Sequence, residues 1–219
     1  DGSFLLKKGV DPAKDQSYFL FSLTQQQLQA ALFPLGGLTK TEVRRLAAAY
    51  KLPVAEKQES QEICFVSDNN YAAFIERQRG AIDRAGEIVD CQGKVLGHHR
   101  GIFHHTIGQR KGLGIAAPKP LYVTAIDTDA RRLVVGTERE LYSSALTAGR
   151  VNWILAPPGG SFLASCKIRY RQEPVACRVT LLADERILVE FPEPVRAVTP
   201  GQALVIYDGD IVLGGGWIE

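Results

Sequence analysis

The chain has 219 residues, and its 26 lysine and arginine residues nearly balance 24 aspartate and glutamate residues, so the formal net charge is only +2. This balance excludes a uniformly basic nucleic-acid-coating protein, and any RNA contact must come from local patches. No stretch approaches the roughly 18 apolar residues of a membrane helix, and the first residues lack the apolar core of a signal peptide. Four scattered cysteines without a CxxC pair fit neither a disulfide scaffold nor a structural zinc site. We expect a soluble, cytoplasmic protein without membrane association.

The first predicted element is a short helix after Thr24, a residue type that caps helix N-termini. Leu28 and Leu32 lie four residues apart and would share one face of this helix. The sequence FPLGG at residues 33–37 would end it.

A second helix is predicted from a capping-box pattern, in which Thr39 precedes Glu42 by three residues. Apolar residues then recur at helical spacing until Pro53, which would end the helix. Asp68 is placed to cap a further helix. These signals predict a helical segment over residues 1–80.

From residue 86 onward, turn signals separate short runs rich in β-branched and aromatic residues, which is the pattern of antiparallel strands. Regularly spaced short strands joined by tight turns favour a small closed barrel. The expected strands form two hairpins and then six further runs: 87–91 with 94–96, 122–126 with 132–135, 151–155, 164–169, 176–182, 187–191, 203–207 and 211–213. We predict an α+β, mostly β fold with a helical N-terminal segment (1–80), a small β-rich central domain (81–145) and a C-terminal antiparallel β-barrel (146–219).

The segment HHRGIFHHTIGQRKGLG at residues 98–114 is dense in histidine, glycine and cations, and this composition predicts a long surface loop. Its histidines lack the helical spacing of a zinc enzyme, and adjacent side chains on an extended chain point in opposite directions, so we predict no metal site. The glycines lack the GK[ST] ending of a P-loop. Phosphate contact through the backbone amides and cations of this segment stays open.

Cys64 lies in SQEICFV, and a cysteine among apolar residues is typically a small buried hydrophobe. The polar residues just before it leave the edge of a reactive site as the alternative.

Two polar clusters stand out besides. If KIRYR lies in a strand, Lys167, Arg169 and Arg171 share one face and present three charges to a phosphate chain, while Tyr170 can stack on a base where the strand ends. A solvated strand face explains the same residues equally well. The cluster KDQ at residues 14–16 fits the start of a helix.

Taken together, these segments resemble the tRNA-specific 2-thiouridylase family (MnmA/TrmU). The resemblance rests on motifs in the family's order: KDQSYFL at 14–20, SQEICF at 60–65, HHTIGQRKGLGI at 104–115, LVVG at 133–136, KIRYRQ at 167–172 and AVTPGQALVIYDGDIVLGGGWIE at 197–219. It implies an enzyme that uses ATP to activate the wobble uridine of tRNA and replaces its C2 oxygen with sulfur from a cysteine persulfide.

By this resemblance, Cys64 matches the catalytic cysteine that carries the persulfide, which reverses the expectation from its neighbours alone. The family's tRNA-contacting residues match six positions: Lys14, Asp15, Gln16, Arg169, Tyr170 and Gln202. The implied partners are tRNA and a sulfur-relay or cysteine desulfurase protein.

The family's SGGxDS-type phosphate loop and first catalytic cysteine have no match in this sequence, which also contains no methionine. We therefore expect a C-terminal portion that is inactive alone, with Mg-dependent ATP binding only in the full-length enzyme and no cofactor in this chain. A non-catalytic RNA-binding β-barrel module is the alternative, and such a module has no use for a persulfide at Cys64.

Overall fold

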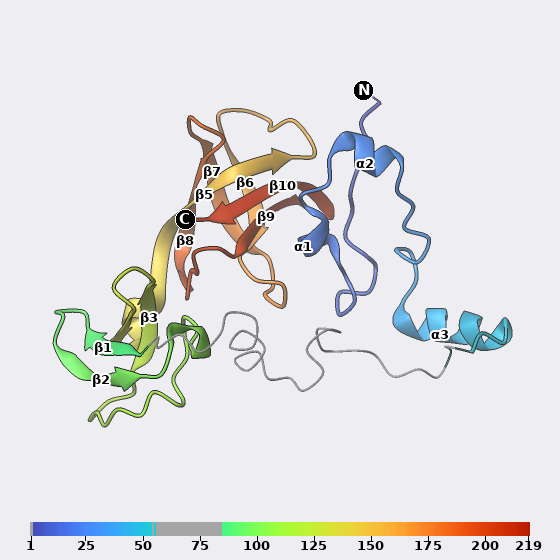
Figure 1. The fold of residues 1–219 in the computed structure, drawn as a ribbon. Helices are drawn as coiled ribbons and strands as arrows, with labels where there is room; N and C mark the ends of the chain where they lie inside the picture. The colour runs from blue at the N-terminus through green and yellow to red at the C-terminus, as the bar shows by residue number, and fades with distance from the viewer. Residues whose placement is uncertain (1, 54, 56–84) are drawn as a thin grey trace. The chain divides into compact units, whose positions relative to one another are not determined.

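A computed structural model describes residues 2–53, 55 and 85–219 (Figure 1). The chain divides into two units, of which the first comprises residues 1–57, 144–195 and 199–219 and the second residues 58–143 and 196–198. The run containing Cys64 and the helix predicted after Asp68 lie outside the described residues. No helix of the described part is long and apolar enough to span a bilayer.

Three short helices form in the N-terminal segment: α1 (Ser17–Leu20), α2 (Gln25–Gln29) and α3 (Lys40–Ala49). The predicted caps are confirmed, because Thr24 and Thr39 each accept a hydrogen bond from a backbone amide three residues on, in a complete capping box. Outside these helices, the described residues of this segment (2–53 and 55) form turns and irregular stretches.

Helices α2 and α3 end earlier than the spacing of their apolar residues predicted. Because α2 stops at Gln29, Leu32 lies beyond it and is 90% exposed, while Leu28 is buried. No residue of α3 is buried. It ends before Pro53, because Lys51 adopts a left-handed backbone (φ 54°) and Leu52 donates its amide to the Ala47 carbonyl, which is the pattern of a helix C-terminus.

The second unit holds a four-stranded sheet made of β1 (Gly86–Asp90), β2 (Val95–His99), β3 (Tyr122–Asp127) and β4 (Arg132–Gly136). The strand order is β2-β1-β4-β3, with β1 and β4 parallel and the two predicted hairpins confirmed. Its buried core comprises Ile88, Leu113, Val123, Leu133 and Val135.

The prediction of one long loop at residues 98–114 was right for residues 105–114, which contain no helix or strand, and wrong for the first part of the segment. His98 and His99 belong to β2, because they pair with Glu87 and Gly86 of β1. A short 3-10 helix follows at Ile102–His104. Extended pairing with β1 therefore continues further than the composition indicated.

The predicted barrel is confirmed as a closed six-stranded barrel in the order β10-β5-β8-β7-β6-β9. Several strands are longer than expected; their bounds are β5 (Tyr142–Trp153), β6 (Ser161–Lys167), β7 (Val175–Leu181), β8 (Ile187–Arg196), β9 (Ala203–Asp208) and β10 (Ile211–Ile218). A short 3-10 helix, Glu138–Leu141, precedes β5. Strand β10 needs glycine where β5 approaches it closely, because a Cβ at Gly214 would lie 2.3 Å from the Asn152 carbonyl oxygen of β5.

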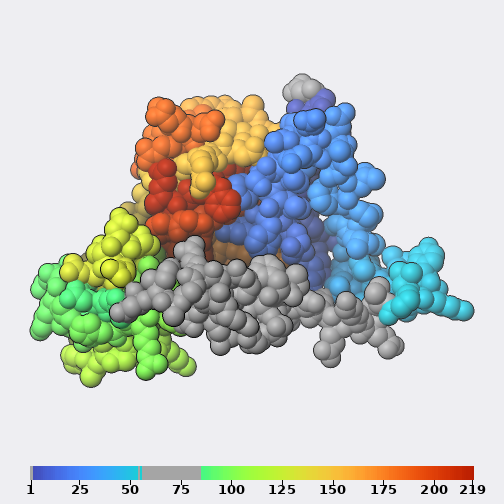
Figure 2. Space-filling view, in the orientation of Figure 1, coloured from blue at the N-terminus to red at the C-terminus, as the bar shows by residue number. Residues whose placement is uncertain are grey.

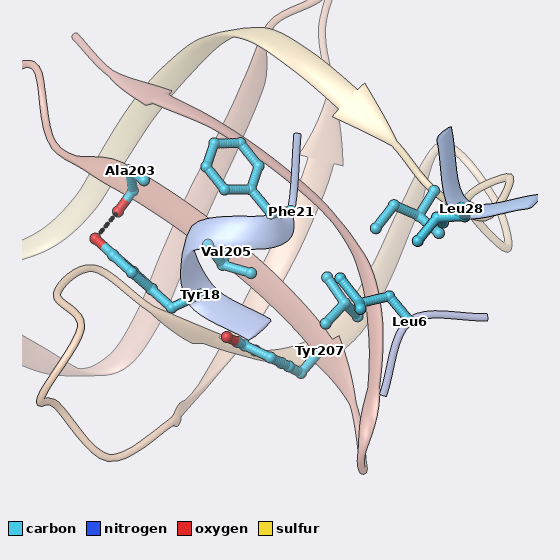
Figure 3. Close-up of a cluster of buried hydrophobic side chains, with 9 residues drawn as sticks. Leu6, Tyr18, Phe21, Leu28, Ala203, Val205 and Tyr207 are labelled. Atoms are coloured by element: carbon cyan, nitrogen blue, oxygen red, sulfur yellow. Dashed lines mark hydrogen bonds between the residues drawn. The ribbon is translucent and has the colours of Figure 1, made fainter. Parts of the chain in front are cut away.

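The N-terminal segment packs on β9 and β10 of the same unit. Leu6, Tyr18 and Phe21 share a buried core with Val205 and Tyr207 (Figure 3). Backbone bonds from Val212 to the Leu6 carbonyl and from Lys8 to the Asp210 carbonyl fasten the first residues to the barrel. In Figure 2 the blue atoms of this segment lie directly against the red atoms of the last strands. Each large side chain buried in this way contributes about 1.5–3 kcal/mol.

Candidate nucleic-acid interface

The basic cluster KIRYR lies at the end of β6 and turns away from the strand direction. Strand β6 ends at Lys167, Ile168 is buried, and a bond from the Gln172 amide to the Arg169 carbonyl closes a turn. The expectation that Lys167, Arg169 and Arg171 share a strand face was therefore wrong. The burial of Ile168 anchors the turn, and Arg171 is exposed beyond it.

This turn meets the KDQ cluster. The side-chain amide of Gln16 donates a hydrogen bond of 2.8 Å to the phenol oxygen of Tyr170, across 154 residues of sequence. The Tyr170 ring lies 4.6 Å from the Phe19 ring centroid and 6.2 Å from that of Tyr18. The Lys167 ammonium lies 5.9 Å from the Tyr170 ring centroid. An aromatic group flanked by a cation thus stands beside the start of α1.

Asp15 fixes the backbone of the KDQ cluster through the hydrogen bonds of its buried side chain. Its side chain is buried and accepts hydrogen bonds from the Gly9 amide (3.0 Å), the Ser17 amide (3.0 Å) and the Ser17 hydroxyl (2.7 Å). Lys14 and Gln16, on either side of it, are exposed. Asp15 therefore fixes the backbone that presents its two neighbours to solvent.

The TPGQ turn (residues 199–202) and the first residue of β9, which follows it, each make a hydrogen bond to the same region. The Arg169 guanidinium donates to the Thr199 hydroxyl oxygen at 3.1 Å. The Tyr18 hydroxyl donates to the Ala203 carbonyl at 2.8 Å (Figure 3). Gln202, between these positions, is exposed. The structure therefore brings all six predicted tRNA-contacting positions into one unit, where three hydrogen bonds link their segments.

Tyr18 and Thr199 hold this arrangement together, although sequence reasoning assigned them no role. Burial raises the pKa of Tyr18 to about 12, against a smaller lowering effect of the Arg169 charge. The phenol therefore stays protonated and remains a donor. Both residues lie inside motifs on which the family resemblance rests. Their place in those motifs was the only sequence feature that could have pointed to them.

A groove of about 810 Å³ adjoins the KDQ cluster, bounded by residues 5–17 and by residues 32–43. Its walls are largely apolar, and lysines lie along it at positions 7, 8, 14 and 40. The Lys8 ammonium sits 4.4 Å from the Tyr207 ring centroid and donates to the Gly209 carbonyl. The Tyr207 ring is fully buried, so the groove itself presents mainly apolar surface and lysines, and the lysines can contact a nucleic-acid backbone.

Within the histidine cluster, His99 has a structural role. His99 is buried, its Nδ1 accepts from the Gly101 amide and its Nε2 donates to the Arg131 carbonyl, both at 3.0 Å. Burial lowers the pKa of the nearby His105. Over residues 2–53, 55 and 85–219, no three His, Cys, Asp or Glu side chains gather in a way that could hold a metal ion. Of the other cysteines, Cys91 is exposed, whereas Cys166 and Cys177 are buried in the barrel.

Three family sequence models match the chain. They are described as the tRNA methyl transferase HUP domain (residues 1–68), the tRNA methyl transferase PRC-barrel domain (72–137) and the aminomethyltransferase beta-barrel domain (143–218).

Similar curated proteins include the tRNA-specific 2-thiouridylases MnmA of Geotalea uraniireducens, 61% identical over all 219 residues, and of Geobacter metallireducens, 58% identical. MnmA 1 of Caldanaerobacter subterraneus is 48% identical over 217 residues. The matched region covers 58%, 60% and 60% of these relatives, respectively, so the chain spans about three fifths of their length. By sequence, this chain belongs to the tRNA-specific 2-thiouridylase family.

Proposed function

We propose that this chain supplies the tRNA-binding surface and the sulfur-carrying cysteine of a tRNA 2-thiouridylase, which transfers persulfide sulfur to C2 of the wobble uridine. The family membership supports the reaction class. The observation that carries the RNA-binding part is the Gln16–Tyr170 hydrogen bond, because it joins two segments that the family resemblance implicates independently in tRNA contact.

In this proposal the exposed Lys14 and Gln16 contact the tRNA backbone, Tyr170 stacks on an unpaired base, and Arg169 holds the turn through Thr199 while adding positive charge. Gln202 adds a polar contact from the neighbouring turn. Asp15 acts as a positioning residue, because its oxygens are occupied by the Gly9 and Ser17 groups.

Cys64 is the proposed sulfur carrier. Its thiolate attacks the outer sulfur of a donor persulfide, a cysteine persulfide forms on Cys64, and the donor leaves as a thiolate, so no external oxidant is consumed. The donor is a sulfur-relay or cysteine desulfurase protein in the reducing cytoplasm. Such a persulfide is a better nucleophile than a thiol at neutral pH.

ATP with Mg²⁺ belongs to the proposed reaction of the full-length enzyme. Within the described ranges, no three carboxylate, histidine or cysteine side chains come together that could hold a metal ion. The steps proposed for this chain therefore comprise sulfur loading and tRNA binding, and none passes through ATP.

Sulfur loading can be tested with a cysteine desulfurase and ³⁵S-labelled cysteine. We expect the wild-type chain to acquire label that a reducing agent releases, Cys64→Ser to acquire little, and Cys91→Ser, a control at an exposed cysteine, to match wild type. Label that persists in Cys64→Ser would contradict the assignment. A chain that binds tRNA without accepting sulfur would instead be a non-catalytic RNA-binding module.

The tRNA-binding part can be tested by a salt titration of tRNA affinity. Arg171→Gln should lower the slope of log affinity against log salt concentration by about one, which corresponds to the loss of one phosphate contact. Arg178→Gln, at an exposed position of β7, is the matched control and should leave it unchanged. A salt-independent affinity of the wild-type chain would contradict the proposal.

A further inference from the structure

The glycine-rich segment of the second unit folds around a pocket of about 380 Å³. The pocket lies between two parts of one loop that leads into β3. Its lining includes the cationic residues Arg110 and Lys119 and the glycines Gly112 and Gly114. It belongs wholly to the second unit, whereas the candidate interface described above belongs to the first.

The charge around this pocket is positive. Its lining contains two cations and no carboxylate. The surrounding stretch, residues 91–126, contains no aspartate or glutamate but five cations: Lys94, Arg100, Arg110, Lys111 and Lys119. In the part of the chain that the structure describes, neither Arg110 nor Lys119 forms an ion pair, and both are exposed. A near-neutral chain therefore concentrates unbalanced positive charge at one pocket.

The backbone adds further donors for an anion. Gly112 and Gly114 have left-handed backbones, with φ of 77° and 67°, which glycine adopts without strain. Their amides donate to no acceptor among the described residues. Amides exposed by such conformations form concave anion sites of the type that holds phosphate groups.

The pocket is held in place before any ligand arrives. Leu113, between the two glycines, is buried in the core of the sheet, and Ile115 and Leu121 pack against that core. The Gln109 side chain accepts a hydrogen bond from the Thr106 amide (3.0 Å) and donates one to the Lys111 carbonyl (2.8 Å). A preorganised site loses less entropy when it binds.

We infer that this pocket binds a phosphate group and that its occupant is a phosphodiester of the tRNA backbone. The inference rests on the proposed function. An RNA phosphate fits better than a buried cofactor group, because Arg110, Lys119 and both glycines are exposed and reachable by a polymer. Phosphate contacts position a protein on RNA without reading its sequence. The second unit would thus supply a contact additional to those of the first.

The test compares the double variant Arg110→Gln/Lys119→Gln with Lys94→Gln, a single lysine-to-glutamine change at an exposed position of the same unit outside the pocket. We expect the double variant to weaken tRNA affinity about tenfold and to lower the salt slope by about one, while Lys94→Gln changes neither. In the wild-type chain, a titration with tRNA should shift the amide NMR signals of Gly112 and Gly114. Circular dichroism checks that the variants are folded.

If the wild-type chain binds tRNA but the double variant behaves like Lys94→Gln, the pocket inference is wrong and the proposed function stands. If inorganic phosphate shifts the two glycine amides but tRNA does not, the assignment to an RNA phosphodiester is wrong. Failure of the wild-type chain to bind tRNA would overturn the proposed function, and this inference with it.

Discussion

Gln16 and Tyr170 are joined side chain to side chain by a hydrogen bond of 2.8 Å across 154 residues of sequence. Two neighbouring bonds tie the same two segments to this part of the chain: Arg169 donates to Thr199 of the TPGQ turn, and Tyr18 donates to Ala203, the residue that follows the turn. The three segments therefore form one connected surface that rests on the barrel core, and a change in one segment should affect the others.

Asp15→Ala should destabilise the first unit by about 1–3 kcal/mol, because it leaves the Gly9 and Ser17 amides without their acceptor. Urea unfolding measures this loss. Asp129→Ala, at an exposed position in a turn, is the control and should have little effect. Equal stability of the two variants would show that the Asp15 bonds contribute nothing.

The first unit should lose stability at alkaline pH. Burial raises the pKa of Tyr18 and of Tyr207 to about 12, above the ordinary value of 10.0. The folded state holds these protons more tightly, so the associated stability is fully present below pH 10 and is lost as the pH rises through 12. Absorbance at 295 nm should show two late phenol titrations, and Tyr18→Phe should remove one. Complete phenol ionisation near pH 10 in the folded chain would contradict the assigned burial.

Helix α3 should depend on its cap more than on packing, because none of its residues is buried. Thr39→Ala removes the capping box and should cost the helix about 1 kcal/mol. Faster amide exchange within Lys40–Ala49, without a change in unfolding of the barrel, is the expected result. Thr41→Ala, at an exposed position inside the helix, should not accelerate exchange. An unchanged exchange rate in Thr39→Ala would show that something other than the cap holds the helix.

Features with local causes were predictable from the sequence. The capping boxes at Thr24 and Thr39 and the tight turns between strands depend on residues within a few positions of one another. The barrel was predictable because strand spacing is a repeated local signal.

Features with distant causes were not predictable in this way. The bend after Lys167 depends on the burial of Ile168, and the end of β2 depends on pairing of His99 with Gly86. The six candidate tRNA-contacting positions came from family resemblance, and their proximity became visible only when contacts such as Gln16 to Tyr170 were known. No local pattern encodes a contact across so many residues.

Tyr170→Ala should weaken tRNA binding by about 1–3 kcal/mol, since base stacking on an aromatic ring has this magnitude. Tyr170→Phe keeps the ring and loses only the bond from Gln16, so it should retain most of the affinity. Tyr142→Ala, at an exposed tyrosine of β5, is the control and should match wild type. Equal losses in the Ala and Phe variants would indicate that the hydroxyl, and not the ring, carries the contact.

A double-mutant cycle of tRNA affinity with Gln16→Ala, Tyr170→Ala and the combined variant tests most directly whether these segments form one tRNA-binding surface. We predict that each single change weakens binding and that the combined loss differs from the sum of the single losses by at least about 0.5 kcal/mol, because linked residues are not independent. Strictly additive losses, or affinities equal to that of the wild-type chain, would contradict this account.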